Sequence, residues 1–129
     1  MPATDIYVGS TYDKKEEITM LIKDFYFFKE ETEVKDSEAI PNSKGNILVI
    51  RVDSEATFEI EIKGCLDLET EPNKYNSLAA ISMNDLKVHT SIIEPNVYQI
   101  DISGCKKVKA SIISLGEGSL TVYGIIKEG

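Results

Sequence analysis

Apolar and polar residues alternate at every second position in several segments of this chain. Ala56–Lys63 places Ala, Phe, Ile and Ile on one side and Thr, Glu, Glu and Lys on the other, and Val97–Ile102 and Lys107–Ile112 repeat the pattern. Because successive side chains of a strand point to opposite faces, this alternation predicts half-buried β-strands with one solvated face. We expect the shared core to contain Phe58, Ile60, Ile62, Ile100, Ile102, Val108, Ile112, Leu120 and Val122.

Two further segments, Asn46–Val52 and Leu120–Ile126, are apolar on both faces. The first is typical of a central strand that is covered on both sides. Shorter strands are expected at Leu78–Met83 and Ile6–Val8, and turn residues such as those of Pro41–Gly45 separate the segments. Strands that recur about every 8–12 residues are typical of an antiparallel sandwich or barrel. We expect an all-β fold, an antiparallel β-sandwich of jelly-roll type.

The segment Ile18–Phe28 has two interpretations. Its apolar residues recur at helical spacing, and Asp13 followed three residues later by Glu16 resembles a helix capping box. Aromatic and β-branched residues dominate the segment, however, and these favour a strand. We predict a strand and keep the helix as the alternative; the charged stretch Lys29–Ser37 that follows is expected to be an exposed loop or hairpin.

The length of 129 residues predicts one domain spanning residues 1–129, with residues 1–17 as an N-terminal arm. At this size, folding hides about two-thirds of the chain's surface, which is enough for a core without disulfides or metals. No apolar run approaches the roughly 20 residues that span a bilayer. The first residues lack the basic and apolar regions of a secretion signal, so export through such a signal is not expected.

Charge is unevenly distributed along the chain. Residues 1–74 contain 17 acidic and 9 basic residues, whereas residues 75–129 contain 5 of each, and the net charge is −8. Nucleic-acid backbones and anionic membranes attract clustered Lys and Arg, and this chain has a single arginine, Arg51. Neither nucleic acid nor a membrane is therefore expected as a direct partner.

Few side chains are suited to catalysis. His89 is the only histidine, and nothing pairs its nearest carboxylates in sequence, Asp85 and Glu94, with a nucleophile, so we expect a histidine in a loop or on an edge strand. Cys65 and Cys105 each follow a glycine and form no CxxC or Cys/His pattern, which argues against zinc. With no export signal, we expect both thiols to be reduced.

Clustered carboxylates raise two further possibilities. Residues 67–73 carry oxygen side chains at alternate positions, as calcium loops do, but Pro72 and Leu78 stand where such a loop needs Gly and Glu. Glu59 and Glu61 lie about 6.8 Å apart by strand rise, within the range of glycosidase carboxylates, yet they share a solvated strand face. We expect no metal, no cofactor and no enzymatic activity.

Tyrosines supply the candidate contact residues. Tyr75 lies in a predicted loop and is the candidate ligand contact, whereas Tyr98 is on the inward face of its strand. Tyr123 and Ile125 give the last strand a second apolar face and are the candidate protein contacts. Another subunit or the N-terminal arm would cover such a face, and a small satellite core is the alternative.

The C-terminal half resembles a known family in three consecutive strands. Tyr98–Gly104 reads Y-x-I-D-I-S-G, a basic strand follows at Lys107–Ile112, and Gly118–Gly124 reads G-x-L-T-V-Y-G. This pattern is similar to the end of small β-sandwich virion proteins of tailed phages and phage-tail-like particles of low-GC Gram-positive hosts. The resemblance covers about residues 45–126 and brings no catalytic residues with it.

The resemblance implies a non-enzymatic structural subunit of a bacteriophage particle, in capsid decoration, neck or tail. Its partners would be other virion proteins and copies of itself, and it would be located in the virion after assembly in the host cytoplasm. A carbohydrate- or cell-surface-binding module is the main alternative, and a small glycan-active enzyme is a third hypothesis.

Overall fold

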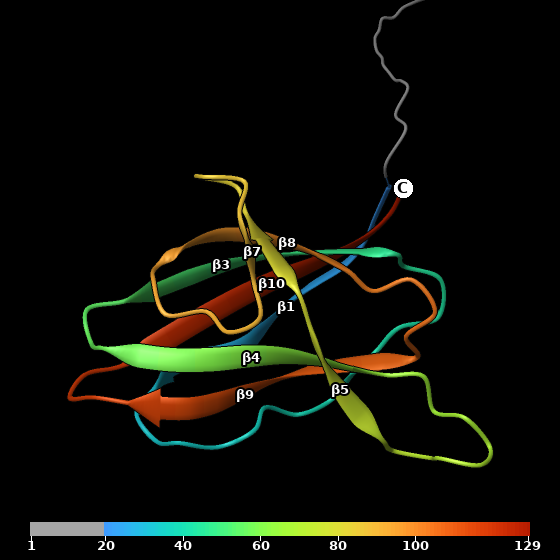
Figure 1. The fold of residues 1–129 in the computed structure, drawn as a ribbon, viewed down its shortest axis with the longest axis horizontal. Helices are drawn as coiled ribbons and strands as arrows, with labels where there is room; N and C mark the ends of the chain where they lie inside the picture. Colours follow the sequence, from blue (N-terminus) through green and yellow to red (C-terminus); the bar gives the residue numbers. More distant parts are fainter. Residues whose placement is uncertain (1–19) are drawn as a thin grey trace, which may run out of the picture.

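The computed structural model describes residues 20–129, which form two antiparallel sheets packed face to face (Figure 1). One sheet has six strands in the order β1-β10-β3-β8-β6-β7, and the other has four in the order β2-β9-β4-β5. In Figure 1, β4, β9 and β5 lie in front of β3, β10 and β1. The strands are β1 (Met20–Glu31), β2 (Ile40–Pro41), β3 (Ile47–Ser54), β4 (Phe58–Cys65), β5 (Tyr75–Leu78), β6 (Ala80–Ser82), β7 (Val88–His89), β8 (Asn96–Asp101), β9 (Lys107–Leu115) and β10 (Leu120–Glu128). The predicted all-β, antiparallel β-sandwich is therefore confirmed.

The core lies between the sheets and contains the side chains that the alternation placed there. All nine predicted core residues are at most 5% exposed. The central strand β3 pairs with β10 on one side and β8 on the other, as its two apolar faces predicted. Its residues Leu48, Ile50 and Val52 are fully buried. Within residues 20–129, no helix has the length and apolarity needed to cross a membrane.

The ambiguous segment is a strand over its described part, β1, which pairs with β10. Its register shifts between Leu21 and Lys23 and again between Tyr26 and Phe28. Such bulges place neighbouring residues on the same face, which accounts for apolar positions that repeat like those of a helix. Phe28 and Phe27 are both buried as a result. The strand continues to Glu31, so the first three residues of the predicted loop at 29–37 belong to β1.

The segment Leu78–Met83 was predicted as one strand, and this is wrong. Leu78 ends β5, which pairs with β4, whereas Ala80 begins β6, which pairs with β8 in the other sheet. Leu78 and Ala80 both face the core, because the core lies between the two sheets and the chain crosses from one to the other. The alternation of inward and outward residues therefore continues from β5 into β6, although the two strands belong to different sheets. The expected strand at Ile6–Val8 and the arm at residues 1–17 lie outside the described residues.

Candidate contact surfaces

The two protein-contact candidates lie on β10, on the outer face of the six-stranded sheet. The register aligns Tyr123 with Tyr26 of β1 and with Arg51 of β3. The two tyrosine rings meet edge to face with centroids 5.2 Å apart, and the Arg51 guanidinium carbon lies 5.9 Å from the Tyr123 ring centre. Tyr123 also donates a 2.8 Å hydrogen bond to Asp24 Oδ2. These contacts hold Tyr123 in one orientation on the surface, and Tyr26 beside it is 47% exposed.

The environment of Tyr123 changes its acidity. The hydrogen bond to the Asp24 carboxylate raises the pKa of the Tyr123 hydroxyl, and partial desolvation raises this pKa further. Tyr123 is therefore a neutral donor over the physiological range. We call Tyr123, Tyr26, Arg51 and Asp24 the Tyr123 cluster. It combines apolar ring surface with fixed polar groups, as contact residues at protein interfaces do.

Ile125 begins an apolar row that crosses the same outer face. Its neighbour on β3 is Val49, followed by Gln99 on β8, Ile81 on β6 and Val88 on β7. Ile125 and Val49 are half-buried, whereas Ile81 and Val88 are exposed. We call these residues the apolar row. Solvated sheet faces are normally polar, so a row broken only by Gln99 indicates a surface suited to contact.

Sequence reasoning identified Tyr123 and Ile125 but missed Tyr26, Val49 and Val88 as their companions. The second apolar face of Asn46–Val52 was a usable signal for Val49. No comparable signal existed for Tyr26, because the bulges of β1 hide which of its residues face outward.

Tyr75 lies on the other sheet and is not brought together with Tyr123 and Ile125. It begins β5 and pairs with Cys65, so the predicted loop position is wrong. It is half-buried, and the Lys109 ammonium lies 4.3 Å from its ring centre. Lys109 also forms a 2.9 Å ion pair with Asp36, whose pKa this contact lowers. One face of the Tyr75 ring is therefore occupied by a lysine that is itself anchored.

The acidic loop at residues 67–73 is closed by its own side chains and by a lysine. Asp67 Oδ1 accepts a 3.1 Å hydrogen bond from the backbone N–H of Asn73. The Lys107 ammonium donates to the side-chain oxygen of Asn73 and lies 3.9 Å from Asp67 Oδ1. A lysine cation thus lies among the loop oxygens. Among residues 20–129, no three side chains of the ligating types are grouped to hold a metal ion.

His89 lies on β7, the edge strand of the six-stranded sheet. Its Nε2 lies 3.9 Å from Asp85 Oδ1, and its ring meets the Tyr98 ring edge to face at 6.1 Å. Tyr98 is buried, as predicted, and donates a 2.7 Å hydrogen bond to the Glu94 carbonyl. These contacts are those of a packed edge histidine.

Both cysteines are buried free thiols in the structure. Burial raises the pKa of the Cys105 thiol, and the nearby Asp101 and Cys65 raise it further. A thiol with a raised pKa is a poor nucleophile at neutral pH.

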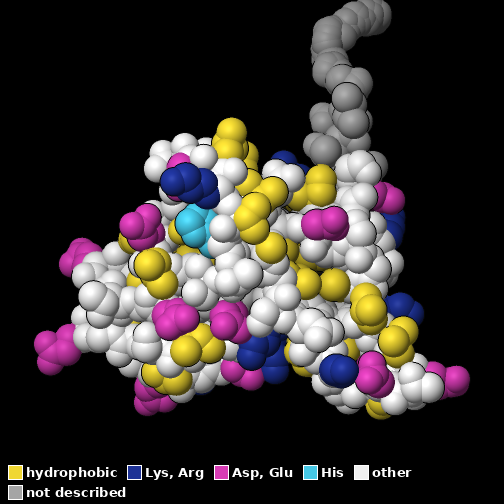
Figure 2. Space-filling view, in the orientation of Figure 1, with side chains coloured by type: hydrophobic (Ala, Val, Ile, Leu, Met, Phe, Trp, Pro, Cys, Tyr) yellow, Lys and Arg dark blue, Asp and Glu magenta, His cyan; other side chains and the backbone are white. Residues whose placement is uncertain are grey.

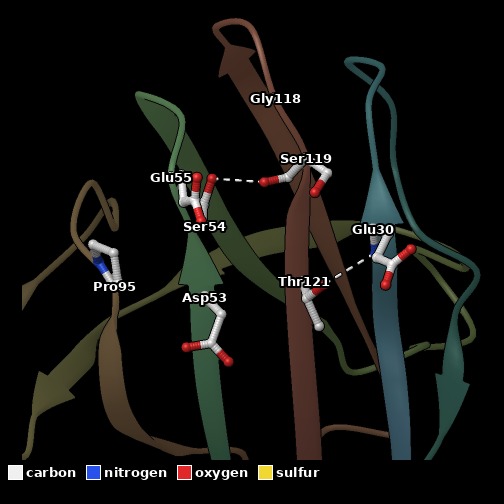
Figure 3. Close-up of a pocket in the computed structure, with 8 residues that line it drawn as sticks. All are labelled: Glu30, Asp53, Ser54, Glu55, Pro95, Gly118, Ser119 and Thr121. Carbon is white, nitrogen blue, oxygen red and sulfur yellow. Dashed lines mark hydrogen bonds between the residues drawn. The ribbon is translucent and has the colours of Figure 1, made fainter.

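An open hollow of about 600 Å³ lies at one end of the six-stranded sheet (Figure 3). Its polar groups already bond to one another: Ser54 Oγ donates to the Ser119 carbonyl at 2.7 Å, and the Glu30 backbone N–H donates to Thr121 Oγ1 at 3.0 Å. Three carboxylates and no cationic side chain line the hollow, which disfavours phosphate and other anions. The lining residues are Glu30, Asp53, Ser54, Glu55, Pro95, Gly118, Ser119 and Thr121.

Comparisons with known proteins agree with this fold. No protein-family model matches the sequence, and no curated protein matches it either. Among solved structures, the chain is similar to the SPBc2 prophage-derived protein YomS, with a TM-score of 0.75 and 21% identity over 88% of this chain and 97% of that one. It is also similar to the PBSX exported protein XepA, with a TM-score of 0.78 and 21% identity over 99% of this chain and 46% of that one. This chain is therefore a small antiparallel β-sandwich of a fold that is also found in the prophage-derived protein YomS and in the exported protein XepA.

Proposed function

We propose that the chain is a non-enzymatic structural subunit of a bacteriophage particle, in capsid decoration, neck or tail. Its partners are other virion proteins and copies of itself, and it joins the particle in the host cytoplasm. The observation that carries the proposal is the outer face of the six-stranded sheet, with the Tyr123 cluster at one side and the apolar row across it. The fold shared with two prophage proteins and the resemblance of residues 45–126 support the phage context.

The energetics of this face favour a protein partner. Burying apolar surface contributes about 25 cal/mol per Å², so covering the exposed Ile81 and Val88 and the remaining exposed surface of the half-buried Ile125 and Val49 with another protein is favourable. The net charge of −8 opposes association with phosphate backbones and anionic lipids. A less acidic protein surface does not carry that penalty.

Particle incorporation tests the proposal. The particle encoded by the neighbouring genes is purified, and this chain is sought in it by mass spectrometry. Ile125→Lys places a charge on the apolar row and is expected to reduce incorporation strongly. The matched control is Ile113→Lys, because Ile113 is 44% exposed on β9 of the other sheet. Wild-type chain that is repeatedly absent from the particle, or equal loss in both variants, argues against this function.

A carbohydrate- or cell-surface-binding module is the second candidate. The exposed Tyr26 beside Tyr123 favours it, because aromatic rings on a flat sheet can pack against sugar faces while Asp24 and Arg51 supply polar contacts. Tyr75 on the other sheet is the separate candidate derived from sequence. Saturable binding to a cell-wall glycan that is lost in Tyr26→Ala or Tyr75→Ala, in a chain absent from particles, favours this second function.

A further inference from the structure

The β6–β7 hairpin, residues 80–89, carries four of the large apolar side chains that are exposed among residues 20–129. Leu86 is 70% exposed, Val88 64%, Met83 47% and Ile81 40%. Figure 2 shows yellow apolar side chains at the top of the molecule, where this hairpin rises in Figure 1, beside the cyan His89. This end of the apolar row is therefore its most exposed part.

Hydrogen bonds within the hairpin define the conformation of its turn. The Leu86 N–H donates to the Ser82 carbonyl at 2.8 Å, and the Ser82 N–H donates to the Lys87 carbonyl at 3.0 Å. Asp85 Oδ1 accepts a 2.9 Å hydrogen bond from the Lys87 backbone N–H. Leu86 itself has a φ of 59°, a left-handed conformation that suits Gly or Asn and costs energy for leucine. A strained and exposed leucine at a turn is explained best by a contact that its side chain makes.

Backbone groups beside Leu86 are also available for pairing. Within residues 20–129, β7 is the last strand of its sheet and no strand pairs with its outer edge. Ile81 lies opposite Val88 in the antiparallel β6–β7 ladder, and the Ser82–Lys87 hydrogen bond precedes this pair. Hydrogen-bonded and non-hydrogen-bonded pairs alternate in such a ladder, so the N–H and C=O of Val88 point away from β6. A strand that runs antiparallel to β7 can bond to both groups.

The order of charged residues along the hairpin favours a second copy of this chain as the partner that binds there. Asp85 and Lys87 carry opposite charges on either side of Leu86. Rotation by 180° about an axis near Leu86 brings Asp85 of one chain to Lys87 of another, and the reverse pair forms at the same time. The same axis places Leu86 of the two copies against each other and brings Asn84 of each copy opposite Val88 of the other, whose N–H and C=O point toward it. We infer that this hairpin is a self-association surface, whose partner is the same hairpin of a second copy of this chain.

This inference rests on the proposed function, since it names the surface through which copies meet. One hairpin is smaller than the roughly 1,200 Å² of a stable interface, so the dimer is weak in solution. Repetition strengthens weak contacts once several copies are held in one particle, because each further contact forms at high effective concentration.

Sedimentation equilibrium of the purified chain over a wide concentration range measures the contact directly. The wild type is expected to show a monomer–dimer equilibrium, and Leu86→Gly should raise the dissociation constant by roughly tenfold or more. This substitution also relieves the backbone strain, so the variant folds at least as well as the wild type. Leu68→Gly is the matched control, because Leu68 is 47% exposed in a separate loop, and it should leave the equilibrium unchanged.

Lys87→Glu tests the charge pairing, since it sets acid against Asp85 of the second copy. It should weaken dimerisation at low salt and have less effect at high salt. A wild type that is monomeric throughout, or a Leu86→Gly variant that dimerises like the wild type, overturns the inference. So does a monomer that binds neutral phosphatidylcholine vesicles through Leu86. A monomeric chain that still enters particles refutes the hairpin contact alone, whereas a dimer that never enters particles refutes only the proposed function.

Discussion

Gly64 on β4 offers a sharp test of the packing between strand and loop. The residue is buried, and a Cβ added there would lie 2.5 Å from Cys105 Sγ and 2.9 Å from Leu78 Cδ1. Its backbone is not in the left-handed region, so Gly64→Ala introduces a steric conflict without a conformational one. The conflict with Cys105 is the closer of the two.

The magnitude follows from two opposing effects. Overpacking of a buried site costs about 1–3 kcal/mol. Replacing glycine by alanine within a strand recovers about 0.5–1 kcal/mol of conformational entropy. We therefore expect Gly64→Ala to lower the free energy of unfolding by about 0.5–2 kcal/mol. Cys105→Ala removes the sulfur and makes room, so the double variant should recover most of this loss through a coupling of about 1–2 kcal/mol.

Urea unfolding followed by far-UV circular dichroism measures each free energy by linear extrapolation. Gly118→Ala is the control, because Gly118 has a φ of 127° and lies in the β9–β10 turn. Its cost arises from the backbone and should be the same with or without Cys105→Ala. If the coupling between Gly64→Ala and Cys105→Ala is below about 0.5 kcal/mol, the sulfur does not occupy this space and the reasoning fails.

Three further outcomes are expected. Phe58→Ala should cost about 3–5 kcal/mol in the same assay because Phe58 is 5% exposed, and a loss below about 1 kcal/mol would mean that the faces of β4 are reversed. The unfolded, unreduced protein should contain two free thiols per chain by titration, from Cys65 and Cys105; finding none would place the protein in an oxidising compartment. Asn42→Ala should cost about 2–4 kcal/mol in urea unfolding, because the buried Asn42 side chain makes three backbone hydrogen bonds of 2.8–2.9 Å whose partners would be left unsatisfied; a loss below about 1 kcal/mol would show that water replaces them.

The local pattern of apolar and polar residues was sufficient to predict the buried faces of the strands that alternate regularly. The inward faces of β4, β8 and β9 followed directly from the spacing of Phe58, Ile60, Ile100 and Val108, because a strand reverses its side chains at every residue. The two apolar faces of β3 likewise predicted its central place in a sheet. These features depend only on neighbours within one segment.

Pairing between segments that are distant in sequence determined the features that the local pattern did not predict. The crossing between Leu78 and Ala80 left no mark in the alternation, because both sheets turn their apolar sides to the same core. Tyr26 joined Tyr123 only through the β1–β10 register, which the bulges of β1 set. The exposed edge at Val88 likewise depends on which strand ends the sheet. Contact surfaces of a sandwich are assembled across strands that lie far apart in sequence, so spacing along one segment is not sufficient to specify them.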